Sequence, residues 1–251
     1  MKFSFLRTGA ALLLPLSLIS TIPSFAQGPK PDPQVLAQFG LYNNSKLQSL
    51  IDTKGQQMNK VSDRPGDYGF TIVDSPIINA FATPDGHVYF TRGIMAHFNS
   101  EAQFAGVLGH ELGHITARHG QSQQRRSTAA GIGLLLGSII APKITQSIGG
   151  IAQQGLGVLF LKYGRDDERE SDQLGVKYST KIGYDASQMA DFFQTLQRNE
   201  QQNGGSSVPT FLSSHPNSAD RYATVKKLAA QAKQNAGGRH QRGPRLLLAH
   251  D

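Results

Sequence analysis

The segment His110-Glu111-Leu112-Gly113-His114 has residue types and a spacing that suit a metal centre. On an α-helix, residues four positions apart leave the same face one turn apart, so both imidazoles can reach one metal ion. Zn²⁺ binds histidine nitrogen at about 2.0–2.1 Å. Glu111 is offset around the helix, so its carboxylate is expected to reach a metal-bound water instead of the metal. The pattern predicts a site for metal-assisted hydrolysis.

A catalytic zinc site needs a third protein ligand, which the two histidines leave unassigned. The chain has no cysteine, so a thiolate cannot serve. Ala117 and Gly120 stand where an extended metzincin motif has glycine and histidine, and the inverted H-x-x-E-H motif is absent. The third ligand is therefore expected to be a carboxylate from a later helix.

An acidic segment at residues 166–172 supplies the candidate carboxylates. Glu168 and Asp172 are four positions apart and share a helix face, so one can bind the metal while the other accepts the second N–H of a ligand histidine. Glu170 is two residues from each and points elsewhere. Alone, the segment would indicate a solvated, salt-bridged helix face. Together with the histidine motif, it favours a metal ligand.

The elements that position these residues follow from periodicity and turn signals. Ser100 and Gln103 form a capping box for a helix at about 100–119, with the histidine motif in its middle. Three strands followed by a helical majority indicate an α+β fold with a small antiparallel sheet. The other helices are expected at about 45–61, 121–160, 166–183, 186–202 and 218–234, and the strands at 68–73, 77–82 and 87–91, the last two joined by a Pro-Asp-Gly turn.

The charge of the chain does not indicate nucleic-acid binding. The 251 residues have a formal net charge of +7, but five of the 25 lysine and arginine residues lie near the two ends. Basic residues interleaved with aromatic ones are also missing, so no nucleic-acid partner is expected. The absence of cysteine excludes disulfide frameworks and iron–sulfur sites. One domain is expected at 27–235, followed by a disordered, arginine-rich tail at 236–251.

Residues 1–26 have the pattern of a secretory signal peptide. Lys2 and Arg7 precede an apolar stretch that ends in a small-residue cleavage pattern at Ala26. The stretch is too short for a membrane anchor, so we expect cleavage near Gln27 and export of a soluble protein into a bacterial periplasm. A second apolar stretch at 129–141 indicates a buried helix, and peripheral contact with a membrane surface is the alternative.

Further motifs resemble the M48 family of zinc metallopeptidases, the group of HtpX, the CAAX prenyl proteases and BepA-like enzymes. Together with the histidine motif they cover about 45–230, and the chain is most similar to the short, soluble periplasmic type. Ser171 stands where the family usually has alanine, and Gly164 stands where it usually has serine. Both replacements exchange one small residue for another. The matching motifs are Asn79-Ala80-Phe81-Ala82 with Pro84-Asp85-Gly86, Thr91-Arg92-Gly93, Gly106-Val107-Leu108-Gly109 before His110, Arg118-His119, Arg165-x-x-Glu168-x-x-x-Asp172, and Ser214-His215-Pro216 with Arg221.

The resemblance implies a zincin-like (gluzincin) fold and zinc-dependent endopeptidase activity. It implies one Zn²⁺ per chain, held by His110, His114 and Glu168, with Asp172 supporting a ligand histidine. Zn²⁺ lowers the pKa of its bound water toward about 7, and Glu111 is the implied general base that takes a proton as this water attacks the scissile carbonyl.

A further resemblance, to thermolysin-like sites, implies how substrate binds. Asn79, Ala80 and Phe81 would form an edge strand to which an extended polypeptide adds by β-augmentation. Such binding selects unfolded or misassembled cell-envelope proteins. A periplasmic chaperone or assembly factor that uses the same cleft with little proteolysis is the alternative. The sequence does not indicate the cleavage preference, the natural substrates or the oligomeric state.

His215 lies in a loop expected at 208–217, and the resemblance implies that this loop returns to the metal site. His215 could stabilise the oxyanion, with Arg221 fixing the loop or adding positive charge. It could instead occupy the fourth metal position and act as a latch. A purely structural residue at a helix start is the third interpretation. His119 is five positions after His114, turned from the metal face, and is expected to be structural, as are His87 and His97.

Overall fold

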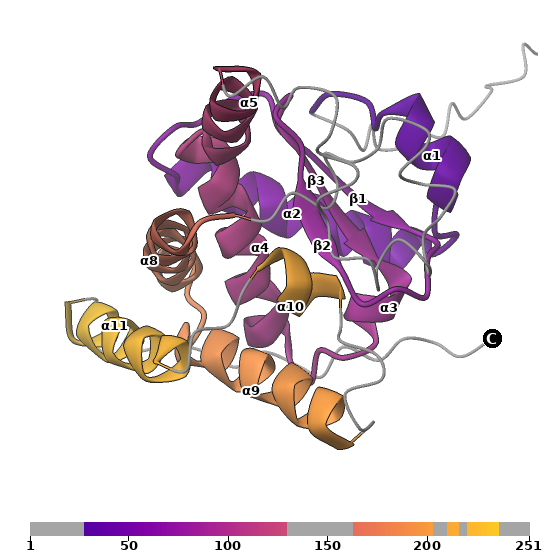
Figure 1. The fold of residues 1–251 in the computed structure, drawn as a ribbon. Helices are drawn as coiled ribbons and strands as arrows, with labels where there is room; N and C mark the ends of the chain where they lie inside the picture. Colours follow the sequence, from indigo (N-terminus) through magenta and orange to yellow (C-terminus); the bar gives the residue numbers. More distant parts are fainter. Residues whose placement is uncertain (1–27, 130–162, 203–209, 216–219, 236–251) are drawn as a thin grey trace, which may run out of the picture.

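Helix α4 (Glu101–Thr116) runs through the middle of the molecule, with a small sheet on one side and helices α8 (Arg165–Lys181) and α9 (Ser187–Gln202) on others (Figure 1). The computed structural model describes residues 28–129, 163–202, 210–215 and 220–235. The expected signal peptide, the expected tail and the apolar stretch beyond Ala129 lie outside these residues. Among the described residues, no helix is both long and apolar enough to cross a membrane.

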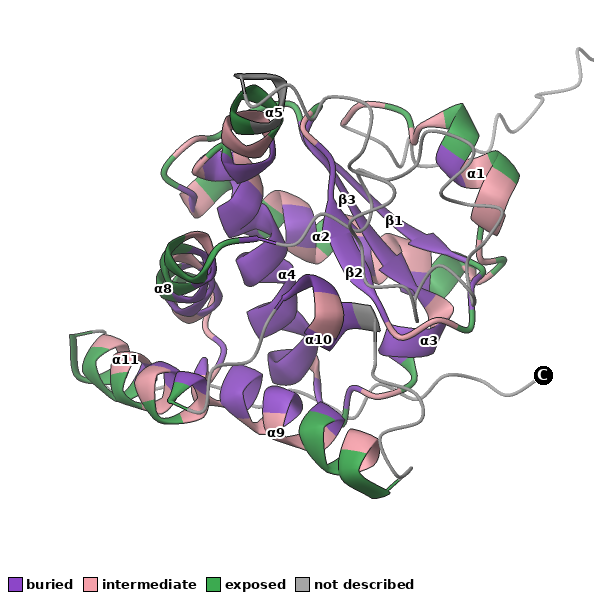
Figure 2. Ribbon diagram, viewed as in Figure 1, coloured by how far each residue is buried: buried purple, intermediate pink, exposed green. Residues whose placement is uncertain are grey.

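The start of α4 confirms Ser100 as the N-cap, because its Oγ accepts a hydrogen bond from the backbone N of Gln103 (3.3 Å). The second bond of the predicted capping box is shifted by one residue, since Gln103 Oε1 accepts from the backbone N of Asn99 (2.8 Å) and not from that of Ser100. Every residue of α4 is buried except Glu101 and Ile115, and Figure 2 shows this helix buried along most of its length. A helix buried on all sides must be apolar or have its polar groups paired, so the histidine motif lies in the core.

Helices α4 and α8 approach each other backbone to backbone. A Cβ atom added at Gly109 would lie 3.0 Å from the carbonyl oxygen of Gly175, and one added at Gly175 would lie 2.9 Å from the backbone N of His110. One added at Gly113 would lie 3.2 Å from Ser171 Cα. Glycines on both helices therefore permit an approach that side chains would prevent, and this approach brings the acidic face of α8 against the histidines of α4.

The sheet is mixed, so the expectation of an antiparallel sheet is correct for one strand pair only. Strands β1 (Gly69–Val73), β2 (Ala80–Ala82) and β3 (His87–Thr91) have the order β1-β3-β2. β2 and β3 form the predicted antiparallel hairpin, whereas β1 pairs with β3 in parallel. The reason is that the connection at 74–79 leaves the position beside β1 empty and places β2 one position further along the sheet. β3 then returns into the position between β1 and β2. β2 consequently lies at an edge of the sheet.

Helix α2 (Ser45–Val61) packs along β1 at the opposite edge. The Gln48 side chain pairs with the backbone of Ile72, donating to its carbonyl oxygen (2.7 Å) and accepting from its N–H (3.1 Å). This amide satisfies backbone groups of an edge strand. In the hairpin turn, Gly86 has a φ of 98°, which glycine adopts without strain.

Three short helices were not predicted from the sequence: α1 (Pro33–Phe39), α3 (Arg92–Met95) and α10 (Thr210–Ser214). They are too short for a helical period to emerge from the residue pattern. The predicted helix at 100–119 ends at Thr116, because Arg118 adopts a left-handed φ of 61°. Helix α5 (His119–Ala129) begins directly afterwards, and helix α11 (Arg221–Asn235) is the last described element.

The contact between α4 and α8 predicts the effect of a substitution at Gly175. Gly175→Ala would gain up to about 1 kcal/mol of helix propensity, but the new methyl group would lie within 3.0 Å of the backbone of α4. Overpacking of this kind costs about 1–3 kcal/mol, so we expect a net loss of about 1–2 kcal/mol in the free energy of unfolding, measured by urea denaturation.

Gly164→Ser is the matched control on α8. The nearest atom to a Cβ at Gly164 is 3.5 Å away, and serine is at least as good as glycine at a helix N-cap. This variant should be as stable as the wild type. Wild-type stability of Gly175→Ala would show that the two helices can separate without cost.

Candidate metal centre

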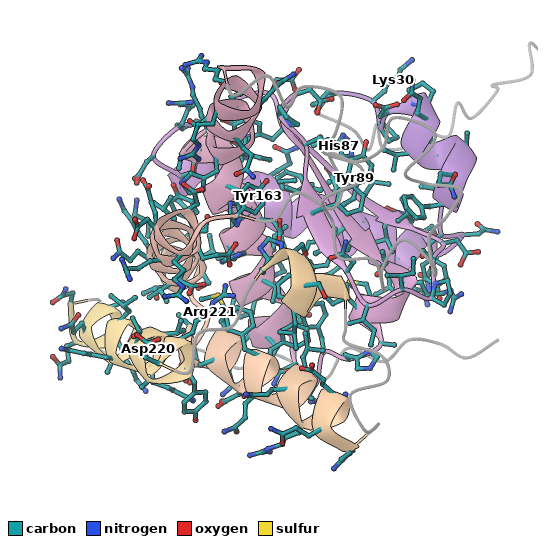
Figure 3. All side chains as sticks on the ribbon, viewed as in Figure 1. Lys30, His87, Tyr89, Tyr163, Asp220 and Arg221 are labelled. Atoms are coloured by element: carbon teal, nitrogen blue, oxygen red, sulfur yellow. The ribbon has the colours of Figure 1, made fainter. Side chains whose placement is uncertain are left out.

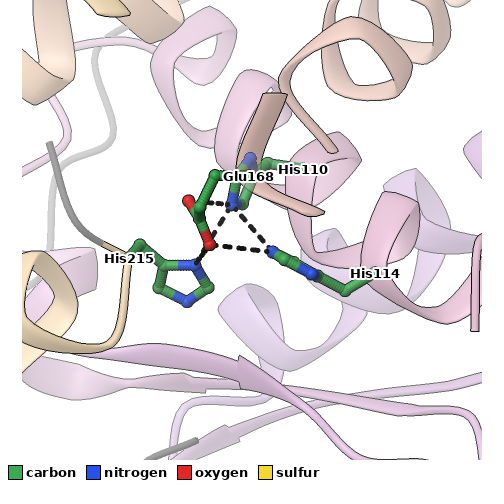
Figure 4. Close-up of side chains that lie close together, drawn as sticks. All are labelled: His110, His114, Glu168 and His215. Atoms are coloured by element: carbon green, nitrogen blue, oxygen red, sulfur yellow. Dashed lines mark hydrogen bonds and ion pairs between the residues drawn. The ribbon is translucent and has the colours of Figure 1, made fainter. Parts of the chain in front are cut away.

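Four side chains from three parts of the fold converge in the core (Figure 4). His110 and His114 come from α4, Glu168 from the first turn of α8, and His215 from the residue after α10. One ligand atom from each lies within 4.8 Å of all the others, and all four residues are buried. The two Nε2 atoms of His110 and His114 are 3.1 Å apart, and each lies 3.5 Å from a carboxylate oxygen of Glu168. The structure thus brings together the three predicted metal ligands.

The donor atoms of this cluster are suited to a divalent metal ion. His110 Nδ1 lies 3.0 Å from Asp172 Oδ1, which can only accept, so the ring proton is on Nδ1 and the Nε2 lone pair faces the cluster. Burial, partly offset by Glu168, holds the pKa of His114 well below its ordinary value, so this ring is neutral. Glu168 Oε2 accepts no hydrogen bond, although the Arg221 guanidinium lies within ion-pair distance of it. Two imidazoles and one carboxylate match a catalytic zinc site.

Arg221 lies at the start of α11 (Figure 3) and contacts residues of the cluster. Its guanidinium donates to both oxygens of Asp172, each at 2.7 Å, and to the backbone oxygen of His215 at 3.3 Å. It also lies 3.1 Å from Glu168 Oε2. Burial alone would raise the pKa of Asp172, but Arg221 and the hydrogen bond with His110 outweigh it and hold that pKa below its ordinary value. Arg221 thus fixes the carboxylate that orients His110.

Glu111 lies beside the cluster without a hydrogen-bond partner. Both of its carboxylate oxygens are buried and accept no hydrogen bond, and Oε1 lies 3.4 Å from His215 Nε2, within ion-pair distance. Burial raises the pKa of Glu111, and the nearby His215 and His110 offset part of that rise. A buried carboxylate with a raised pKa is a suitable general base.

His215 reaches the cluster because α10 is held against the sheet. The backbone N of Phe211 donates to the carbonyl oxygen of Ile78, just before β2 (2.9 Å), and the Phe211 ring stacks on the His215 imidazole at 4.6 Å. His215 Nδ1 then lies 2.9 Å from Glu168 Oε1. Burial lowers the pKa of His215, but the carboxylates of Glu168 and Glu111 outweigh it and raise the pKa above its ordinary value.

Two aromatic side chains near His114 were not predicted as part of the site. The Tyr163 ring stacks on the His114 imidazole, with centroids 3.8 Å apart and an interplanar angle of 22°. His119 Nδ1 lies 3.0 Å from His114 Nδ1. The expectation that His119 is not a ligand agrees with the cluster, but the expectation that it faces away from the site is wrong. Only the adjacency of Tyr163 to the acidic segment could have signalled its place.

The predicted substrate strand lies next to the metal centre at one end only. A small pocket is lined by Ala82, at the end of β2, together with His114 and Tyr163. Phe81 points to the other face, where its ring stacks on Tyr89 at 5.0 Å. Both side-chain polar atoms of Asn79 are buried and without a hydrogen-bond partner.

His87 is a core residue, as expected. It lies in β3, where its Nε2 is 2.8 Å from Thr71 Oγ1 and its ring stacks on Tyr89 (Figure 3). Burial, only partly offset by Asp85, lowers the pKa of His87 to about 4. His97 Nδ1 lies 2.8 Å from the carbonyl oxygen of Gly93, four residues earlier. Neither ring belongs to the metal cluster.

Comparisons with known proteins relate the chain to metallopeptidases. The family model of peptidase family M48 matches residues 43–229. The chain is 30% identical over 197 residues to a putative beta-barrel assembly-enhancing protease of Vibrio cholerae, a match that covers 75% of this chain and 40% of that protein. It is 31% identical over 162 residues to the mitochondrial metalloendopeptidase OMA1 of Arabidopsis thaliana (64% of this chain and 30% of that protein), and 28% identical over 179 residues to the metalloprotease YcaL of Escherichia coli (70% and 66%).

The chain spans less than half the length of the first two of these relatives. The match to the family model nevertheless covers most of the chain, including every residue of the metal cluster. The resemblance inferred from the motifs is confirmed: the chain belongs to peptidase family M48, a family of metallopeptidases.

Proposed function

We propose that this protein is a zinc-dependent endopeptidase. One observation carries the proposal: His110, His114 and Glu168 offer converging ligand atoms, and Glu111, from the same helix as the two histidines, lies beside them buried and without a hydrogen bond. Zn²⁺ is the proposed ion because two imidazoles and a carboxylate are the ligand set of several zinc hydrolases. A chaperone without proteolysis would not need a buried carboxylate that accepts no hydrogen bond beside these ligand atoms, since burying such a carboxylate costs free energy.

The proposed reaction is hydrolysis of a peptide bond. When bound, the metal ion supplies Lewis acidity that polarises the scissile carbonyl and acidifies water. Glu111 accepts a proton from the water that attacks the carbonyl carbon, and it later gives that proton to the leaving nitrogen as the C–N bond breaks. Asp172 and Arg221 keep His110 in the orientation that presents Nε2 to the cluster.

His215 is proposed to act as a latch on this site. Its Nδ1 belongs to the same group of ligand atoms as the nitrogens of His110 and His114. Its Nε2 lies close to the Glu111 carboxylate, so the ring stands where water and substrate must approach the base. A resting site closed by His215 would open when α10 moves away from the sheet.

The proposed substrates are unfolded or misassembled proteins of the cell envelope. The edge position of β2 supports binding of an extended polypeptide through residues 79–81. The name of the Vibrio cholerae relative, a putative beta-barrel assembly-enhancing protease, supports the envelope assignment. We place the mature protein in the periplasm after cleavage near Gln27. A protein that retained Met1 and stayed membrane-bound would contradict this location.

The first prediction from the proposed function concerns the metal. Purified protein is expected to carry about one Zn²⁺ per chain, and Glu168→Gln should lose it, because a neutral amide is a poor substitute for a carboxylate ligand. The measurement is metal content by mass spectrometry. Asp166→Asn is the matched control, since this carboxylate lies on the same helix turn but is 93% exposed and pairs with Arg169. Equal metal content in the two variants would overturn the ligand assignment.

The second prediction concerns the general base. Glu111→Gln keeps the shape of the side chain but cannot accept a proton, so casein cleavage should fall by about 100-fold or more. The Zn²⁺ content should be unchanged, since Glu111 is not among the ligand atoms. If the variant preparation cleaves casein at the wild-type rate, Glu111 is not the base. The cleavage would then come from a contaminating protease, and the non-proteolytic alternative would be favoured.

The third prediction tests the latch. His215→Ala should retain Zn²⁺ through the other three ligands and should cleave a short peptide faster than the wild type, because the approach to Glu111 is open. His97→Ala, which removes a histidine outside the cluster, should leave turnover unchanged. A fall in turnover with unchanged Zn²⁺ would indicate oxyanion stabilisation instead, and unchanged turnover would indicate a structural role.

A further inference from the structure

The turn between α4 and α5 returns the chain toward the metal centre. Arg118 has a φ of 61°, and among the described residues it is the only one other than glycine with a positive φ. Left-handed backbone at a non-glycine residue is uncommon and is maintained only where surrounding contacts compensate for its cost. Here the turn places the buried imidazole of His119 against the outer nitrogen of His114, with the two Nδ1 atoms 3.0 Å apart.

The contacts of His119 give this hydrogen bond a direction. His119 Nε2 lies 3.3 Å from a carboxylate oxygen of Glu170, which only accepts, so Nε2 carries a proton. His119 Nδ1 is then an acceptor, and His114 Nδ1–H is its donor. The lone pair of His114 Nε2 consequently faces the metal cluster. Ser171 Oγ, 3.3 Å from His119 Nδ1, is a second donor to the same acceptor.

The two metal-facing histidines of α4 are thus oriented by different groups. His110 donates to Asp172, a buried carboxylate held by Arg221. His114 donates to His119, an imidazole whose far side meets Glu170 at the surface, where that side chain is 59% exposed. An outer partner fixes both the tautomer and the orientation of a ligand imidazole.

We propose that His119 is a positioning residue for His114, and that the chain His114–His119–Glu170 increases the affinity of the cluster for its metal ion. The proposal rests on the metal centre proposed above. It explains the left-handed turn at Arg118, which places the acceptor atom His119 Nδ1 against His114 Nδ1. It also assigns Glu170, which the sequence suggested points elsewhere, a place at the outer end of the chain.

The experiment measures Zn²⁺ affinity by competition with a chelator. His119→Ala should weaken Zn²⁺ binding by about 10–100-fold, the usual effect of losing an outer partner of a ligand. His119→Asn should recover most of this loss, because its amide oxygen can take the place of Nδ1. His119→Gln should recover less, because its amide corresponds to Nε2. His97→Ala is the matched histidine control and should bind Zn²⁺ as the wild type does.

The outcomes separate this proposal from the proposed function. Wild-type protein that binds no Zn²⁺ would overturn the metal centre itself. Wild-type affinity in a folded His119→Ala variant would overturn only the role of His119, as would an Asn variant no better than the Ala variant. If His119→Ala does not fold, Glu170→Ala at the surface decides: the proposal expects weaker Zn²⁺ binding, and unchanged affinity would overturn it.

Discussion

The backbone contact between α4 and α8 is the constraint on which the metal centre depends. Gly109 and Gly175 face each other across the two helices, with too little room for a Cβ atom on Gly175. The short side chains of Glu168 and Asp172 can therefore reach the histidines of α4 directly. A larger separation would remove the contacts of these carboxylates with His110 and His114. The same glycines that weaken helix propensity thus make the site geometrically feasible.

Charge balance is the second constraint. Glu111, Glu168 and Asp172 are buried close together. Arg221 pairs with Glu168 and Asp172, and His215, whose pKa is raised by Glu168 and Glu111, lies at ion-pair distance from both of them. Buried charges are tolerated when they are paired or coordinate a metal. A divalent cation in the cluster would add positive charge beside these three carboxylates. The electrostatics and the ligand geometry therefore favour the same occupant.

The site is also a meeting point of segments that are distant in the chain. His110 and His215 are separated by 105 positions, yet their ring nitrogens are 3.2 Å apart. Helix α10 accounts for this, because its hydrogen bond to Ile78 ties it to the start of β2. The segment that carries His215 is thus attached to the residue two positions before β2, the strand proposed to bind substrate.

The sequence by itself determined the chemistry and the local elements. The pairs His110/His114 and Glu168/Asp172 share helix faces because helical periodicity is local, and the capping residues of α4 act within one turn. The M48 family assignment was likewise readable from motifs. Only the tertiary structure decided that β1 pairs in parallel with β3 and that His119 orients His114. The first outcome depends on which strand position the chain skips, and the second depends on the left-handed turn at Arg118. Neither feature leaves a periodic pattern in the sequence, since both are set by packing between distant residues.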